Sequence, residues 1–238
     1  MKRPALACSF RLVAALPWAL AGAAVADPGY YLITPYSEPG QWTLDLRYWS
    51  VTPQGGNTVV WPEAGVRYGV NSVWTTELLA SFEGPHPDDL SLNGWNWQNE
   101  ILLTSGQSPF DLALHLQAIH SPDDGNLLQW GALWQTELGL TRVNFNAIFE
   151  RQYQDGAKPV QLKIQWQALH PVVPGLRLGV QGFGELGPWD HWSSHQSHRA
   201  GPSVDWGLPW GELQASYLFG KVYGGRADML TAHLSVPF

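Results

Sequence analysis

Cysteine, charge and long apolar runs are all scarce in this chain of 238 residues. The single cysteine, Cys8, excludes an intrachain disulfide framework and a thiolate metal site. Only 14% of the residues are charged. Even so, no segment after residue 26 has the roughly 20 consecutive apolar residues that a membrane-spanning helix needs. An apolar composition without such a run is typical of strands that expose only one apolar face.

The first 26 residues have the pattern of a cleaved secretory signal peptide. Lys2 and Arg3 precede a stretch rich in alanine, leucine and valine, which closes on Ala24-Val25-Ala26. Charged and helix-breaking residues interrupt this stretch, which disfavours a membrane anchor. We therefore expect a signal peptide over residues 1–26 and a single barrel domain over residues 27–238.

The charge balance of the mature chain argues against nucleic acid as a partner. The expected leader contains three of the 13 basic residues, so ten remain against 20 acidic ones. A protein with this acidic excess repels a phosphate backbone. No linker, low-complexity tract or repeat divides the chain, which predicts one domain.

Alternation of apolar and polar residues dominates the mature sequence. In residues 42–48, Trp, Leu, Leu and Tyr alternate with Thr, Asp and Arg, which is the two-residue period of a β-strand. Pro202 makes one of these segments irregular, because proline cannot donate to a ladder. About twelve segments share the pattern and predict strands: 42–48, 64–70, 74–82, 95–103, 110–118, 128–138, 143–149, 160–168, 176–184, 200–206, 213–219 and 230–238.

The ends of these segments favour a membrane barrel over a soluble sandwich. Tight breaks at 71–72 and 208–210 alternate with wider polar loops at 50–57, 84–91 and 187–197. An even number of strands would return both termini to the periplasmic side. Aromatic residues gather near the strand ends, as in the girdles of membrane barrels, at Trp42, Tyr48, Trp74, Trp95, Trp97, Trp130, Trp134, Trp166, Trp206 and Tyr217.

The last segment, "MLTAHLSVPF", keeps its apolar alternation up to Phe238. With the leader and the amphipathic strands, it is similar to the end of a Gram-negative outer-membrane β-barrel. "YGVNSVWTTEL" and "SHRAGP" resemble segments of uncharacterised proteobacterial porin-like or transporter-like barrels. The resemblance implies an all-β fold, a transmembrane antiparallel up-and-down β-barrel of about 12 strands in the outer membrane. It makes Phe238 the signal for the barrel-assembly machinery, and it implies outer-membrane lipids and periplasmic chaperones as partners.

On each predicted strand, the polar residues that alternate with the apolar ones form the polar phase, and their side chains are the candidate lining of the lumen. A barrel of about twelve strands is wider than a filled eight-stranded barrel and narrower than a general porin of 16 to 18 strands. Acidic groups outnumber basic ones on this phase, so an open lumen would favour small polar or cationic solutes. We expect these pore-lining residues: Arg47, Glu63, Arg67, Glu77, Glu100, His115, Glu137, Arg142, Glu150, Lys163, Arg177 and Glu185.

Two other functions stay open at the level of sequence. If these charges pair across the lumen, the protein is a closed structural barrel without transport. The loop 187–198 could instead hold a lipid-hydrolase site or a metal site, with His191, His195 and His198 as weak candidate ligands. We find no catalytic motif and no cofactor motif, so we assign no catalytic residue, and we expect a small-molecule solute as the ligand.

Overall fold

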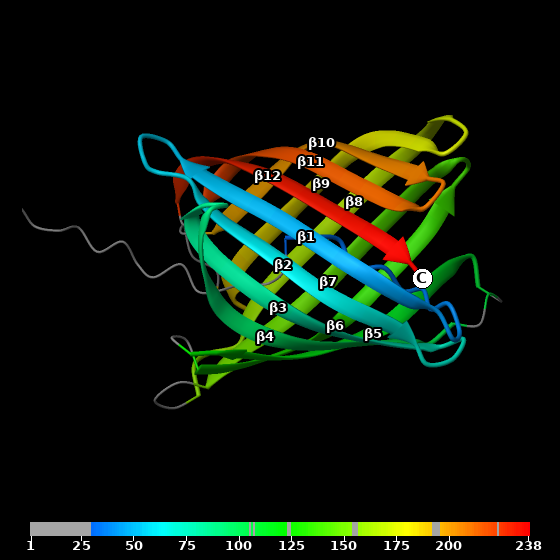
Figure 1. Cartoon of the computed structure of the whole chain (residues 1–238), viewed down its shortest axis with the longest axis horizontal. Helices are drawn as coiled ribbons and strands as arrows, with labels where there is room; N and C mark the ends of the chain where they lie inside the picture. The colour runs from blue at the N-terminus through cyan, green and yellow to red at the C-terminus, as the bar shows by residue number, and fades with distance from the viewer. Residues whose placement is uncertain are drawn as a thin grey trace, which may run out of the picture.

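The computed structural model describes residues 30–104, 106, 108–122, 125–153, 157–191, 196–222 and 224–238. Twelve antiparallel strands form one closed barrel, in which each strand pairs with its neighbours in sequence and β12 closes on β1 (Figure 1). These described residues contain no helix that is long and apolar enough to cross a membrane. The strands are β1 (Trp42–Pro53), β2 (Val59–Gly69), β3 (Trp74–His86), β4 (Asp89–Leu102), β5 (Phe110–Ser121), β6 (Gly125–Leu138), β7 (Thr141–Tyr153), β8 (Gln161–Val173), β9 (Leu176–Pro188), β10 (Ser197–Leu208), β11 (Gly211–Val222) and β12 (Gly225–Pro237).

The structure confirms the fold class and the twelve segments predicted from alternation. No predicted segment extends more than one residue beyond its strand, and the strand with Pro202 is present as β10. The predicted wide loop at 84–91 is wrong, because β3 and β4 continue through it and leave only residues 87–88 between them. Register shifts near this hairpin break the regular alternation, so the sequence there does not read as a strand.

The barrel is polar inside and apolar outside. In β1 the side chains of Asp45 and Arg47 are almost completely buried, whereas Leu44 and Leu46 are 37% and 40% exposed. The same inversion recurs around the barrel: leucine, valine and aromatic side chains face outward, and Gln, Asn and charged side chains face inward. A surface of this kind is unstable in water and matches the hydrocarbon core of a bilayer.

Several of the predicted girdle aromatics lie on that outer surface. Trp42, Trp74, Trp95, Trp97, Trp206 and Tyr217 are 38–57% exposed. The remaining four, Tyr48, Trp130, Trp134 and Trp166, are half-buried.

The segment that precedes β1 enters the lumen, which the sequence analysis did not predict. Residues 38–41 turn at the end of the barrel where β1 begins, and the amide of Gly40, at φ +77°, donates to the Gly69 carbonyl over 2.7 Å. From this turn the chain runs back inside the barrel to Tyr30, as the dark blue trace in Figure 1 shows. The described chain therefore starts inside the lumen, at Tyr30. That both termini of the mature protein lie on the periplasmic side stays a prediction.

Two apolar clusters hold this segment, which we call the lumenal segment (residues 30–37). Tyr30 packs in a buried cluster with inward side chains that include Trp49, Phe183 and Leu218. Tyr31 and Ile33 belong to a second cluster with inward side chains of β5, β6 and β7. Burial of apolar side chains from both the wall and the segment stabilises the filled lumen.

Candidate functional site

Arg47 is the centre of the charged side of the lumen. Its guanidinium lies 2.6 Å from Glu77 and 3.6 Å from Glu63, and all three side chains are almost fully buried. Glu63 also accepts hydrogen bonds from Ser81 and from Asn96, the latter over 2.7 Å. Buried charges of this kind persist only when they are paired and hydrogen-bonded. We call the inward side chains Asp45, Arg47, Glu63, Arg67 and Glu77 on β1–β3 the charged wall.

Asp45 joins β1 to β12 and β2. It accepts a hydrogen bond from Ser235 over 2.5 Å, lies 2.9 Å from His233 Nε2, and pairs with Arg67 Nε at 3.3 Å. The residue types are those of a Ser-His-Asp triad, but Ser235 and Asp45 both contact the same imidazole nitrogen, Nε2. A relay needs the acid on one nitrogen and the hydroxyl on the other, so this geometry supports structure and not nucleophilic catalysis.

Opposite the charged wall, the lumen is lined by primary amides. β2 and β8 stand six strands apart in the ring of twelve, so the strands around β8 form the facing side. Asn146 donates to Gln165 over 2.8 Å, Asn144 donates to Gln135 over 2.7 Å, and Gln167 donates to Gln181 over 2.6 Å. Each pair links neighbouring strands on β6–β9. We call this set of six residues the amide wall.

Three further pairs of oppositely charged or titratable side chains line the lumen. Glu100 is 3.3 Å from His115, Lys163 is 2.6 Å from Glu150, and Arg199 is 3.2 Å from Glu185. Each of these pairs joins two adjacent strands, so the Lys163–Glu150 and Arg199–Glu185 charges are neutralised within the wall instead of across the lumen.

A looser cluster of charges lies near the end with the short turns. Arg142 contacts Glu137 at 3.4 Å and Asp205 at 3.5 Å, and Arg177 is 3.8 Å from Glu137. The side chains of Arg142 and Glu137 are 26% and 45% exposed, so water screens these pairs. This cluster is therefore available to a solute in a way that the buried pair of Arg47 and Glu77 is not.

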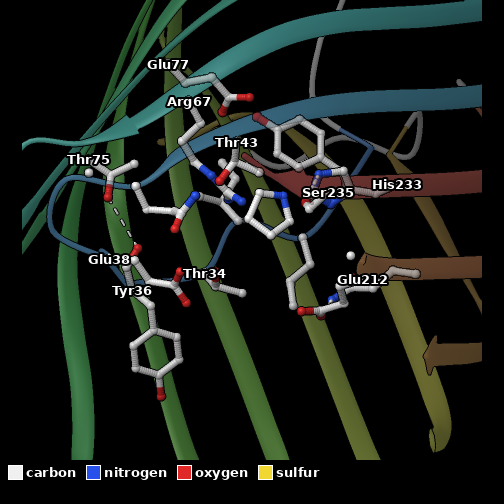
Figure 2. Close-up of a pocket in the computed structure, with 18 of the residues that line it drawn as sticks. Thr34, Tyr36, Glu38, Thr43, Arg67, Thr75, Glu77, Glu212, His233 and Ser235 are labelled. Carbon is white, nitrogen blue, oxygen red and sulfur yellow. Dashed lines mark hydrogen bonds between the residues drawn. The ribbon is translucent and has the colours of Figure 1, made fainter. Parts of the chain in front are cut away.

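A cavity of about 480 Å³ opens at this end and forms a vestibule in front of the lumenal segment. Figure 2 shows Thr34, Tyr36 and Glu38 of the chain before β1 among the wall side chains Arg67, Glu212, His233 and Ser235. The charged side chains that line the vestibule are four glutamates and three arginines, Glu38, Glu77, Glu100, Glu212, Arg47, Arg67 and Arg142.

Tyr36 marks the boundary between the lumenal segment and the vestibule. Its hydroxyl donates to Asp111 over 3.0 Å and accepts a short hydrogen bond from the Gln135 amide. Partial burial, followed by the hydrogen bond to Asp111, raises the pKa of Tyr36 to about 12. Thr75 donates to the Tyr36 carbonyl over 3.4 Å, which is the dashed line in Figure 2.

The candidate pore-lining residues are all placed on the lumenal phase, but the structure groups them unevenly. Six of them, Arg47, Glu63, Glu77, Glu100, His115 and Glu150, are buried in hydrogen-bonded or paired positions. Arg67, Glu137, Arg142 and Arg177 are partly exposed towards the vestibule end, whereas Lys163 and Glu185 lie deeper. That these twelve residues line a conducting path stays a prediction.

The lumenal segment is the main feature that sequence reasoning missed, although a signal for it was present. Leu133, Ile148, Phe183 and Leu218 are apolar residues on the polar phase of their strands, and they are almost completely buried. Apolar side chains that face a lumen need an apolar partner inside it. They indicate where Tyr30, Tyr31 and Ile33 pack, but not which part of the chain supplies that partner.

The predicted histidine site is not assembled among the described residues. His195 lies outside them, and His198, in β10, accepts a hydrogen bond from Trp166 Nε1 over 3.2 Å. Across the described ranges, no group of three or more His, Cys, Asp or Glu side chains is arranged to hold a metal ion. The hydrolase alternative for this loop stays a prediction, and Cys8 with the expected leader also lies outside the described residues.

Comparisons with known proteins identify the fold. No protein-family model matches the chain, and no curated protein is similar to it in sequence. The structure is similar to the NanC porin, with 8% identity, 81% of this chain and 98% of that chain covered, and a TM-score of 0.60. It is similar to an outer-membrane channel from Pseudomonas putida F1, with 13% identity, 89% and 99% coverage, and a TM-score of 0.58. It is also similar to the KdgM porin in complex with disordered oligogalacturonate, with 8% identity, 82% and 99% coverage, and a TM-score of 0.57.

Identities this low show the fold alone. The inside-out barrel agrees with the match to these structures, which covers 81–89% of this chain. The chain therefore has the closed antiparallel β-barrel fold of Gram-negative outer-membrane porins.

Proposed function

We propose that this protein is a narrow outer-membrane channel for small polar or cationic solutes. The observation that carries the proposal is a closed barrel with an apolar outer surface and a charged lumen that opens into a 480 Å³ vestibule. The three similar structures, described as porins or as an outer-membrane channel, support transport over catalysis.

The proposed selectivity follows from the vestibule. Its four glutamates against three arginines leave a slight negative excess, which attracts small cations as rings of acidic side chains do. The exposed pairs around Arg142 present both charge signs to a solute. The proposed pore-lining set is the twelve residues given above, with the partly exposed ones in first contact with the solute.

The proposed location is the outer membrane, reached after cleavage of the signal peptide at residues 1–26. In this proposal, periplasmic chaperones and the barrel-assembly machinery handle the chain, and Phe238 is part of the assembly signal. Its support in the structure is that β12 pairs with β1 along its length and that the Phe238 amide bonds to the Trp42 carbonyl over 3.0 Å.

A closed structural barrel is the second candidate function. The lumenal segment supports it, because Tyr30 to Ile33 are buried inside the barrel. A second cavity beside Tyr30 and Ile33 measures only about 20 Å³, which is room for about one water molecule.

Single-channel recording of the refolded mature protein in a planar bilayer separates these candidates. Discrete current steps with a modest cation preference in a salt gradient are expected for a channel. A silent bilayer with a heat-modifiable, folded barrel would contradict the channel and favour the closed barrel.

Thiol labelling tests the proposed lining without recording a current. We expect Arg67→Cys to react with a water-soluble maleimide in vesicles, because Arg67 lines the vestibule. Val66→Cys, at the neighbouring position in sequence, is the matched control. Val66 is 39% exposed on the outer face of the barrel, so lipid should shield it from the maleimide. Faster labelling of Val66→Cys than of Arg67→Cys would contradict the membrane arrangement.

A further inference from the structure

Two residues of the amide wall, Asn146 and Gln165, bind the backbone of the lumenal segment. The Ile33 amide donates to Gln165 Oε1 over 3.4 Å, and the Ile33 carbonyl accepts from Asn146 Nδ2 over 2.9 Å. Because Asn146 also donates to Gln165, the two side chains form one unit with an acceptor for an N–H and a donor for a C=O. This recognition depends on a peptide group and not on the side chain at position 33.

Tyr30 lies in an aromatic pocket with an arginine over its ring. The ring centroid of Tyr30 is 6.0 Å from Trp49 and 5.7 Å from Phe183, both in edge-to-face geometry. Arg199 Cζ lies 4.5 Å from the same centroid, and Glu185 holds this guanidinium at 3.2 Å. The wall alone positions the arginine, so the pocket does not depend on the tyrosine that fills it.

Tyr31 occupies a second pocket of the same design. Arg47 Cζ lies 3.5 Å from its ring centroid, and Glu77 holds that guanidinium at 2.6 Å. The Tyr31 hydroxyl donates a short hydrogen bond to Gln98. Two adjacent aromatic residues are thus recognised by two arginines that the barrel wall fixes independently.

The remaining contacts of the segment are aliphatic. Ile33 packs in a buried cluster with Ala113, Leu133 and Ile148. On β5, the strand of Ala113, both side-chain amide atoms of Gln117 have no hydrogen-bond partner among the described residues, although the residue is 1% exposed. A buried amide with unused donors and acceptors is unfavourable unless a polar ligand can satisfy it.

We propose that this part of the lumen is a binding site for short extended peptides that carry two adjacent aromatic residues followed by aliphatic ones. The chain's own lumenal segment occupies the site as an intramolecular ligand. The inference rests on the proposed function, since the site lies in the same lumen that the solute would cross. A covalently linked ligand has an effective concentration in the millimolar range, so a free peptide competes only when the segment is weakened.

Peptide binding to a weakened segment variant is the test. The first variant, Tyr30→Ser/Tyr31→Ser, changes the segment and leaves the barrel wall unchanged. The second variant, Ile33→Pro, removes the backbone N–H that donates a hydrogen bond to Gln165. The probe is the acetylated peptide YYLITPYS with fluorescein at its C-terminal end, the end that leads to the vestibule. Anisotropy in detergent should show binding to both segment variants at least about tenfold tighter than to the unmodified protein.

Two comparisons decide whether the binding is specific. A probe with serine in place of both tyrosines should bind about tenfold more weakly, because it leaves both arginine pockets empty. Gln165→Ala, added to the segment variant, should weaken binding severalfold. Gln167→Ala is the matched control in the same strand and on the same face, and it should leave the affinity within about twofold, because Gln167 bonds to Gln181.

Each outcome separates this site from the channel. Equal affinity for the two probes, or equal effects of Gln165→Ala and Gln167→Ala, overturns the peptide site. Specific binding by a barrel that passes no current in any variant contradicts the channel and leaves the site intact. Current steps without specific peptide binding support the proposed channel and contradict the proposed peptide site.

Discussion

The charged wall and the amide wall solve the same physical problem in different ways. Both bury polar side chains that must be satisfied inside the lumen. The charged wall does so around Arg47, with ion pairs of 2.6 to 3.6 Å that depend on complementary partners. The amide wall uses pairs such as Asn146 with Gln165, in which each side chain can be both donor and acceptor. The charged wall is therefore less tolerant of change, and the amide wall is better suited to bind a varied polar ligand.

The largest effect is expected from Arg47→Ala. The substitution leaves Glu63 and Glu77 without their shared buried cation, which should lower the free energy of unfolding by about 3–5 kcal/mol. Urea unfolding of the barrel in phospholipid vesicles, followed by tryptophan fluorescence, measures this loss. Arg142→Ala is the matched control, because its pairs are partly exposed and should contribute less than about 1 kcal/mol. Similar losses for the two variants would contradict the distinction between buried and exposed pairs.

A smaller loss is expected on the amide wall. Asn144→Leu leaves the buried Gln135 Oε1 without the donor that lies 2.7 Å away, at a cost of about 1–3 kcal/mol in unfolding free energy. In the double variant Asn144→Leu/Gln135→Leu the unpaired Gln135 acceptor is removed, and only the partly exposed Tyr36 hydroxyl loses a donor. The loss in the double variant should therefore be less than the sum of the single losses. The same urea series forms the double-mutant cycle, and strict additivity would show that the pair is not coupled.

The vestibule is expected to control selectivity with little effect on stability. Arg142→Gln removes one of three lining cations, so the cation-to-anion permeability ratio should rise, by less than about fivefold. Reversal potentials in a salt gradient measure this ratio. This rise in the permeability ratio should be smaller at high salt, since salt screens exposed charges. Arg199→Gln, a substitution at a buried and deeper position, is the comparison variant.

The smallest expected effect concerns pH. The Tyr36 pKa of about 12 lies above the ordinary value of 10, so its neutral form stabilises the docked segment fully below pH 10. This contribution should disappear as the pH rises from 10 to 12, when the phenol ionises beside Asp111. Phenolate absorbance at 295 nm should show a late titration phase whose amplitude falls in Tyr36→Phe. A late phase of unchanged amplitude in Tyr36→Phe would contradict the raised pKa of Tyr36.

Much of the barrel is predictable from residue order because alternation is a local property. All twelve strands and their inward phase follow from the two-residue period, including β10 with Pro202. The hairpin at 84–91 was mispredicted because its register shifts interrupt that period. The twelve candidate lining residues lie on the expected phase, but phase alone does not distinguish buried Glu77 from partly exposed Arg142.

The sequence by itself determined the strands, the apolar belt and the polar lumen, because each depends on residues two positions apart. Only the tertiary structure decided what fills that lumen. Residues 30–37 have no period of their own, and their partners range from Arg47 to Arg199, so nothing local connects them. Closure of β12 on β1 brings these distant positions around one axis, and only then do two arginines, two amides and an apolar cluster form a site for the segment.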